Sequence, residues 1–288
     1  MDTAAFSVTL ITIIVLLIVI ISSFIYVIPI IFVRRFHTGA NVLLVGLSVN
    51  GIICSILWVV WNSISIINPT LLVKSKEICI AMNYLSTLVN SLIIYCLVVI
   101  TINQFFAVIY PKKKLFHTVK CAIFSITVQW IVSIIVSIPD VVISVPVCVN
   151  GVDAPRWLYI YRFVTILVFP SILKIVLNAS IFCFVRSSTR RVKPKENAKG
   201  LSNASPKWKK TRDTQLLKHM IFLYVVFIFG WGPIYLLPIA ASFTTVSPLV
   251  LAIFQLLPVV SSFTIVLDLF YYNRDLIRYF KEQCLKCF

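Results

Sequence analysis

Residues 79–106 read CIAMNYLSTLVNSLIIYCLVVITINQFF, a run without a single charged side chain. A helix needs about 20 mostly apolar residues to cross a bilayer, and this run is longer than that. Six further stretches of similar character surround it, at residues 6–33, 41–67, 122–147, 158–185, 216–241 and 248–272. Hydrophobic residues make up 60% of the 288 residues and charged residues only 12%, which excludes an ordinary soluble globule. The sequence predicts an all-α membrane protein, a single domain of seven transmembrane helices.

The positive charges fall in alternate gaps between these stretches. Of the 26 Lys and Arg residues, 21 lie in or next to the first, third and fifth gaps or after the seventh stretch. Cytoplasmic loops carry such an excess, so we expect an extracellular amino terminus and a cytoplasmic carboxyl terminus. Residues 187–213 are predicted to form a flexible basic cytoplasmic loop, and residues 273–288 a cytoplasmic tail. A net charge of +17 would suggest a nucleic-acid partner in a soluble protein. Here the placement of the positive charges indicates that they orient the chain in the lipid bilayer instead.

The eight cysteines divide by their expected compartment. Cys79 begins the third stretch at its outer end, and Cys148 follows the fourth in an expected outer loop. Both would face an oxidising environment, where a disulfide between them can persist. Cys284 and Cys287 follow a basic segment at the inner membrane surface, which favours S-acylation, with two free thiols as the alternative.

Short motifs in several stretches point to one family. The sixth stretch contains Phe227-x-x-x-Trp231-x-Pro233, and the seventh ends in Asp268-Leu269-Phe270-Tyr271-Tyr272. The third ends in Asn103-Gln104-Phe105 and continues to a Tyr-Pro pair at residues 110–111. In this order and in these stretches, the motifs resemble those of the rhodopsin-like (class A) G-protein-coupled receptors, as does the expected Cys79–Cys148 disulfide.

The resemblance implies a multi-pass plasma-membrane receptor with a short amphipathic eighth helix and no enzymatic activity. It would bind an extracellular ligand, a peptide or a small molecule, and pass the signal to a heterotrimeric G protein by a two-state rearrangement of its helices. It implies no cofactor and no metal centre. The residues expected to act as the activation switch are Asn103, Gln104, Phe105, Phe227, Trp231, Pro233, Asp268 and Tyr272.

The chain departs from the family at the cytoplasmic end of the third helix. Gln104 stands where the family has arginine, and Asn103 where it has an acid, so the usual charge pair is missing. Raised signalling without ligand is one consequence we expect. A receptor-like fold with weak or lost coupling to G proteins is the main alternative, and a small membrane transporter is a less favoured one, because the chain shows no internal repeat.

Polar residues within the apolar stretches are the candidates for binding. A carboxylate inside a membrane helix is costly, so Asp268 is expected to share a polar core with Asn50 and Asn90, either as a neutral acid or ionised around water or an ion. The family places ligands among the outer halves of the third, fifth, sixth and seventh helices. The candidate lining residues are Asn83, Ser86, Thr87, Asn90, Asp140, Trp231, Tyr235, Gln255 and Ser262. Ser86 stands where amine receptors carry aspartate, which disfavours an amine ligand.

Overall fold

The computed structural model describes residues 3–68, 75–110, 118–150, 155–191, 206–241, 243 and 247–287. Over these residues the chain is helical, and seven helices are long and apolar enough to cross a membrane. Their bounds are α1 (Thr3–Phe32), α2 (Gly39–Ile67), α4 (Lys76–Ile109), α5 (Val119–Asn150), the composite of α6 (Arg156–Arg162), η3 (Phe163–Val168) and α7 (Phe169–Arg191), α8 (Pro206–Ala241) and α9 (Pro248–Tyr272). The short helix α10 (Arg274–Cys287) follows. The predicted fold class is confirmed.

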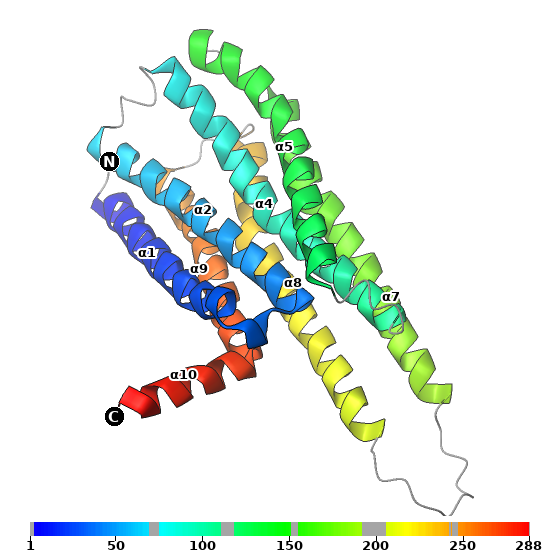
Figure 1. Ribbon diagram of the computed structural model, residues 1–288. Helices are drawn as coiled ribbons and strands as arrows, with labels where there is room; N and C mark the ends of the chain where they lie inside the picture. The colour runs from blue at the N-terminus through cyan, green and yellow to red at the C-terminus, as the bar shows by residue number, and fades with distance from the viewer. Residues whose placement is uncertain are drawn as a thin grey trace, which may run out of the picture.

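The helices form a closed bundle (Figure 1). Helix α1 packs against both α2 and α9, and α8 packs against α9, so the first and last spanning helices are neighbours. Helix α4 contacts α2, α5 and α7 and is the most buried of the seven, with half of its most apolar window inside the bundle. The central position of α4 brings one of its residues, Asn90, to the cavity described below.

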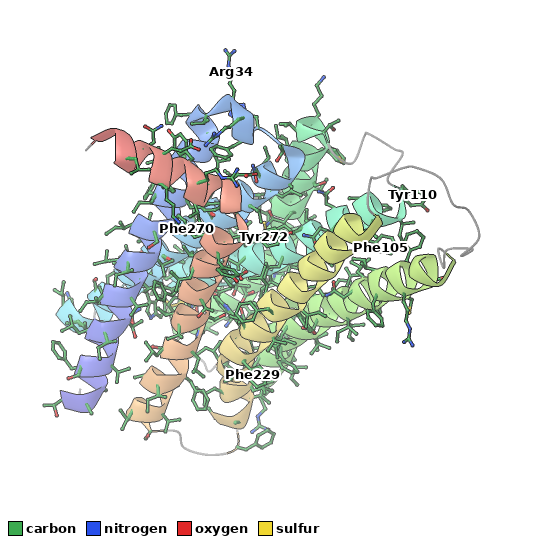
Figure 2. All side chains as sticks on the ribbon, turned by 90° about the horizontal axis from the view of Figure 1, so that it is seen from below. Arg34, Phe105, Tyr110, Phe229, Phe270 and Tyr272 are labelled. Carbon is green, nitrogen blue, oxygen red and sulfur yellow. A yellow bond between two sulfur atoms is a disulfide. The ribbon has the colours of Figure 1, made fainter. Side chains whose placement is uncertain are left out.

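The outward faces of the helices are apolar. Phe229 on α8, for example, is 74% exposed and points away from the bundle (Figure 2). A water-soluble protein would bury such side chains, whereas lipid tails are as apolar as the side chains themselves. The inner faces meet in a core around Leu97, Phe227 and Trp231. This distribution of apolar surface is that of a helix bundle with lipid as its solvent.

The fifth spanning segment is interrupted by a π-helical turn, η3, immediately before Pro170. Proline lacks an N–H group and its ring clashes with the carbonyl one turn earlier, so the helix needs a local change of pitch there. A proline in the sequence predicts a distortion, but the form of the distortion is a finding of the structure.

Helix α10 is held at the end of the bundle by contacts from the segment between α1 and α2. The Arg35 guanidinium lies 4.9 Å from the Phe36 ring centroid and 5.0 Å from that of Tyr279, and 3.9 Å from the Glu282 carboxylate. Leu276, a residue of α10, is fully buried. These contacts orient α10 across the end of the bundle (Figure 1).

Helices extend from both sides into the segment 187–213, which was expected to be a loop. Helix α7 continues to Arg191, and α8 begins at Pro206. Residues 192–205 lie outside the described residues. Cys148, expected in a loop, lies inside α5, which continues to Asn150.

Candidate functional site

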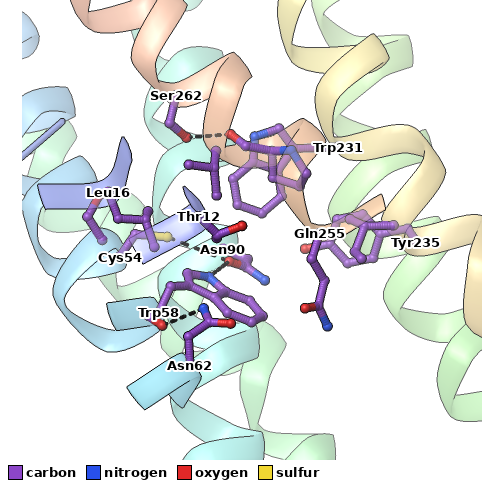
Figure 3. Close-up of a pocket in the computed structure, with 14 residues that line it drawn as sticks. Thr12, Leu16, Cys54, Trp58, Asn62, Asn90, Trp231, Tyr235, Gln255 and Ser262 are labelled. Carbon is purple, nitrogen blue, oxygen red and sulfur yellow. Dashed lines mark hydrogen bonds between the residues drawn. The ribbon is translucent and has the colours of Figure 1, made fainter. Parts of the chain in front are cut away.

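A cavity of about 90 Å³ lies inside the bundle between α1, α2, α4, α8 and α9 (Figure 3). Five of the nine residues expected to bind ligand line it, namely Asn90, Trp231, Tyr235, Gln255 and Ser262. The structure therefore brings together polar residues from three helices that are far apart in the sequence.

The other four candidates do not line this cavity. Ser86 donates a hydrogen bond to the Asn83 carbonyl at 2.9 Å, and the Asn83 amide donates to the Cys79 carbonyl at 3.1 Å. Thr87 and Asp140 are buried elsewhere in the bundle. We expected the site among the third, fifth, sixth and seventh helices, but no residue of the fifth lines this cavity.

Residues of the first two helices complete the lining, and sequence reasoning missed them. Thr12 and Leu16 come from α1, and Trp58 and Asn62 from α2. Their spacing could have indicated this, because a tryptophan and an asparagine four residues apart lie on one helical face. Inside an apolar span, a face with such polar groups is expected to turn towards the interior of the bundle. Without the tertiary arrangement, nothing in the sequence links that face to Asn90.

Three aromatic rings run along α8 from the cavity towards the core. The Phe227 and Trp231 ring centroids are 6.2 Å apart with 22° between their planes, and those of Trp231 and Tyr235 are 6.4 Å apart at 23°. All three side chains are buried. The i, i+4 spacing produces this column, and Pro233 lies inside the same helix.

Asn50 and Asn90, expected to share a polar core with Asp268, each have partners of their own. The Asn50 amide donates to the Leu92 carbonyl at 3.2 Å, and the Gln129 amide donates to the same carbonyl at 2.9 Å. The Asn90 carbonyl oxygen accepts from the Trp58 indole at 3.2 Å. Among the described residues, no group of three His, Cys, Asp or Glu side chains could hold a metal ion.

The remaining expected switch residues lie towards the end of the bundle that carries α10. Figure 2 looks onto this end, with Phe105 on α4 and Tyr272 at the end of α9. Asn103, Gln104 and Phe105 are partly buried, and the Gln104 side-chain oxygen is buried without a hydrogen-bond partner among the described residues. Gln104 therefore forms no polar lock through that oxygen.

Asp140 is engaged by an arginine and is not directed into the cavity. It is completely buried in α5, and the Arg162 Nε donates to its Oδ1 at 2.6 Å, with Nη2 against the same oxygen. Arg162 lies within the fifth spanning segment. Beside the pair, the hydroxyl of Tyr161, the residue before Arg162, donates to the Val136 carbonyl at 2.9 Å, one helical turn from Asp140. These contacts join α5 to α6.

Lys174 is a buried cation on α7. Only 2% of it is exposed, and its ammonium has no hydrogen-bond partner among the described residues. The ammonium lies 5.1 Å from the centroid of the Tyr224 ring on α8. A cation facing an aromatic ring is attracted to it, but the ring does not replace the hydration that the ammonium has lost.

We expect Lys174→Met to stabilise the protein by about 1 kcal/mol. An unpaired charge within a membrane helix costs about 2.5–3.5 kcal/mol, which exceeds a desolvated cation–π attraction of about 2 kcal/mol. The melting temperature of the purified protein in detergent measures the effect. Tyr224→Leu is the matched control. It should lower the melting temperature more in the protein with Lys174 than in the Lys174→Met variant. A lower melting temperature for Lys174→Met would show that the ammonium has a stabilising partner.

The expected disulfide is present. Cys79 on α4 and Cys148 on α5 are bonded, with their Cα atoms 5.9 Å apart. Cys284 and Cys287, the expected acylation sites, both lie in α10, and their side chains are outside the described residues.

The closed bundle of seven spanning helices, its internal cavity and the disulfide between its third and fourth spans define a membrane protein of the seven-helix class. The sequence profile described as the 7-transmembrane receptor (rhodopsin family) matches residues 22–266, and the chain belongs to that family. Among curated proteins, none matches this chain. The chain is therefore a multi-pass membrane protein of the rhodopsin family.

Proposed function

We propose that this protein is a G-protein-coupled receptor whose cavity binds an extracellular ligand and whose helices shift between two packings when it does so. The single observation that carries the proposal is the aromatic column of Phe227, Trp231 and Tyr235. Trp231 and Tyr235 line the cavity, and Phe227 lies in the hydrophobic core of the bundle.

In this mechanism the ligand acts by its differential affinity for the two packings. A ligand that contacts Trp231 favours one arrangement of the column over the other. Because Pro233 interrupts the hydrogen-bond ladder of α8, the helix can pivot there without breaking further backbone bonds. Movement of its lower half would then open a cytoplasmic site for the heterotrimeric G protein.

Guanine-nucleotide exchange tests this proposal directly. Membranes from cells that express the receptor are expected to raise exchange on an added G protein above that of control membranes. Trp231→Ala should change this rate, because it removes the centre of the column. Phe229→Ala is the matched control, since Phe229 is on the same helix but faces outward. Equal exchange with and without receptor, for every G-protein class added, would contradict coupling.

A receptor-like protein with weak coupling is the second candidate, and Gln104 is the observation that favours it. Its side-chain oxygen is buried without a partner among the described residues, at the position where the family carries arginine. An amide there cannot form the charge-assisted hydrogen bonds of a guanidinium. The same feature also predicts a resting state that is less firmly held.

We therefore expect the double substitution Asn103→Asp with Gln104→Arg to lower ligand-independent exchange about fivefold, as an added ion pair of roughly 1 kcal/mol stabilises the resting state. Exchange by the unliganded protein, normalised to surface expression, measures this. Gln104→Met serves as the control without charge and should not lower the rate. Parent activity no higher than that of the double variant would count against a loosely held resting state.

The proposed orientation has the amino terminus outside the cell and the carboxyl terminus in the cytoplasm of a plasma-membrane protein. The placement of the basic residues supports it. Antibody labelling of intact cells should reach an epitope tag at the amino terminus only, and permeabilised cells should show both tags.

A further inference from the structure

The polar groups around the cavity differ in whether they already have partners. Most of them bond within the protein: the Asn62 amide donates to the Trp58 carbonyl at 2.7 Å, and the Ser262 hydroxyl donates to the Pro258 carbonyl at 2.8 Å. The Trp58 indole donates to Asn90. These groups shape the cavity, but their donors are occupied.

Two buried donors in the lining have no partner within the part of the chain that the structure describes. The Trp231 indole nitrogen and the Tyr235 hydroxyl have no hydrogen-bond partner among the described residues, although both side chains line the cavity. Trp231 is 2% exposed and Tyr235 9% exposed, so water outside the bundle does not solvate them. Asn90 lies close to the Tyr235 hydroxyl without forming a hydrogen bond to it. A buried donor without an acceptor is unfavourable, and a bound molecule that brings an acceptor relieves the cost.

The lining also carries no charge. None of the described residues around the cavity is Asp, Glu, Lys or Arg. The buried acid on α5, Asp140, is already neutralised by Arg162. A charged ligand would lose its hydration in this cavity without meeting a counter-charge, which costs several kcal/mol.

The volume limits the size of the occupant. At about 90 Å³ the cavity is small. An apolar cavity of about 150 Å³ holds a benzene-sized molecule, so this one suits a group of similar or smaller size.

From these observations, and resting on the proposed receptor function, we infer that the ligand is a small uncharged molecule whose carbonyl or ether oxygen accepts hydrogen bonds from Trp231 and Tyr235. The indole N–H can only donate, so the ligand must supply the acceptor. The aromatic faces of Trp58 and Trp231 flank the remainder of the cavity and suit an apolar frame (Figure 3).

Binding to the purified receptor, without any G protein, tests the ligand class. The uncharged probes are cyclopentanone and tetrahydrofuran, which are about the size of benzene or smaller. They are compared with pyrrolidine and cyclopropanecarboxylic acid, which are of similar size and carry a charge at neutral pH. The uncharged probes are expected to raise the melting temperature and the charged ones to leave it unchanged. No shift from any uncharged probe, or a larger shift from a charged one, would overturn the inference.

Tyr235→Phe provides a second test. A ligand-binding hydroxyl and a structural hydroxyl predict different changes in the ligand-free melting temperature when the hydroxyl is removed. Deleting a hydroxyl that has no partner should leave the ligand-free melting temperature equal or higher, while it weakens binding of an uncharged probe about three- to tenfold. Tyr95→Phe is the matched control, because the Tyr95 hydroxyl donates to the Thr165 carbonyl at 2.9 Å away from the cavity. That variant should lower the ligand-free melting temperature and leave probe affinity unchanged. If Tyr235→Phe behaves like Tyr95→Phe, its hydroxyl is structural and the inference fails.

The two proposals fail separately. Binding of uncharged probes without any nucleotide exchange would sink the proposed coupling and leave the ligand class standing. Ligand-independent exchange together with probe binding limited to the charged compounds would do the opposite.

Discussion

Replacing Arg162 by methionine is expected to destabilise the bundle by about 3–5 kcal/mol, the largest effect of any single substitution considered for this protein. The reason is the partner that remains. Asp140 is completely buried, and the Arg162 Nε–H group bonds its Oδ1 at 2.6 Å. Without the guanidinium, an uncompensated carboxylate stays in a low-dielectric interior.

The intact Asp140–Arg162 pair contributes far less to the stability of the bundle than is lost when Arg162 alone is removed. This difference gives the prediction a specific control. Asp140 has lost its hydration, and the Arg162 side chain is only 21% exposed. A buried ion pair of this kind can be replaced by apolar side chains of similar volume with little loss. Asp140→Leu combined with Arg162→Met should therefore recover most of the stability that Arg162→Met alone removes. Heating the purified protein in detergent and measuring the fraction that stays monodisperse gives both values.

A matched arginine on the same helix separates charge burial from a general effect of removing arginine. Arg156 at the start of α6 is exposed and lies 5.4 Å from the centroid of the Phe243 ring. Arg156→Met should change stability by about 0.5 kcal/mol or less. If Arg162→Met were equally mild, or if the double variant were no better than the single one, the pair would not be a buried ionic contact.

Gly230→Ala is expected to destabilise the protein by about 1–3 kcal/mol, because a methyl group has no room between α8 and α9. A Cβ atom at residue 230 would clash with the Ser261 Cβ and approach the Ser261 Oγ to 2.7 Å and the Leu257 carbonyl oxygen to 3.2 Å. The Ser261 hydroxyl donates to the Val226 carbonyl at 3.0 Å, which holds the two helices together at this point. Trp231 is the next residue, so the forced separation would also move the aromatic column.

Gly232 offers the control two residues further along the same helix. A Cβ atom there would meet only the Leu167 Cδ2, at 3.9 Å, which is ordinary van der Waals contact. Gly232→Ala should be neutral or should stabilise α8 by up to about 1 kcal/mol through helix propensity. Equal losses of stability at both positions would point to a need for glycine in α8 unrelated to its contact with α9.

Residue spacing along one helix predicts which of the candidate site residues lie side by side. Trp231 and Tyr235 are four residues apart on one helix, so their side chains must share a face. Asp140 shows the limit of this reasoning. A lone acid near the end of an apolar span suggests a ligand contact, and only the packing of α5 against α6 reveals that Arg162 neutralises it.

The sequence by itself determined the seven spans and the disulfide, because the length of an apolar run and the placement of cysteines in it are local properties read along the chain. It also determined the family, through motifs within single helices. Only the tertiary structure decided where the cavity lies, that α1 and α2 line it, and which polar groups remain without partners. These features depend on the rotation of each helix against its neighbours, and that rotation is set by side-chain packing between segments far apart in the sequence.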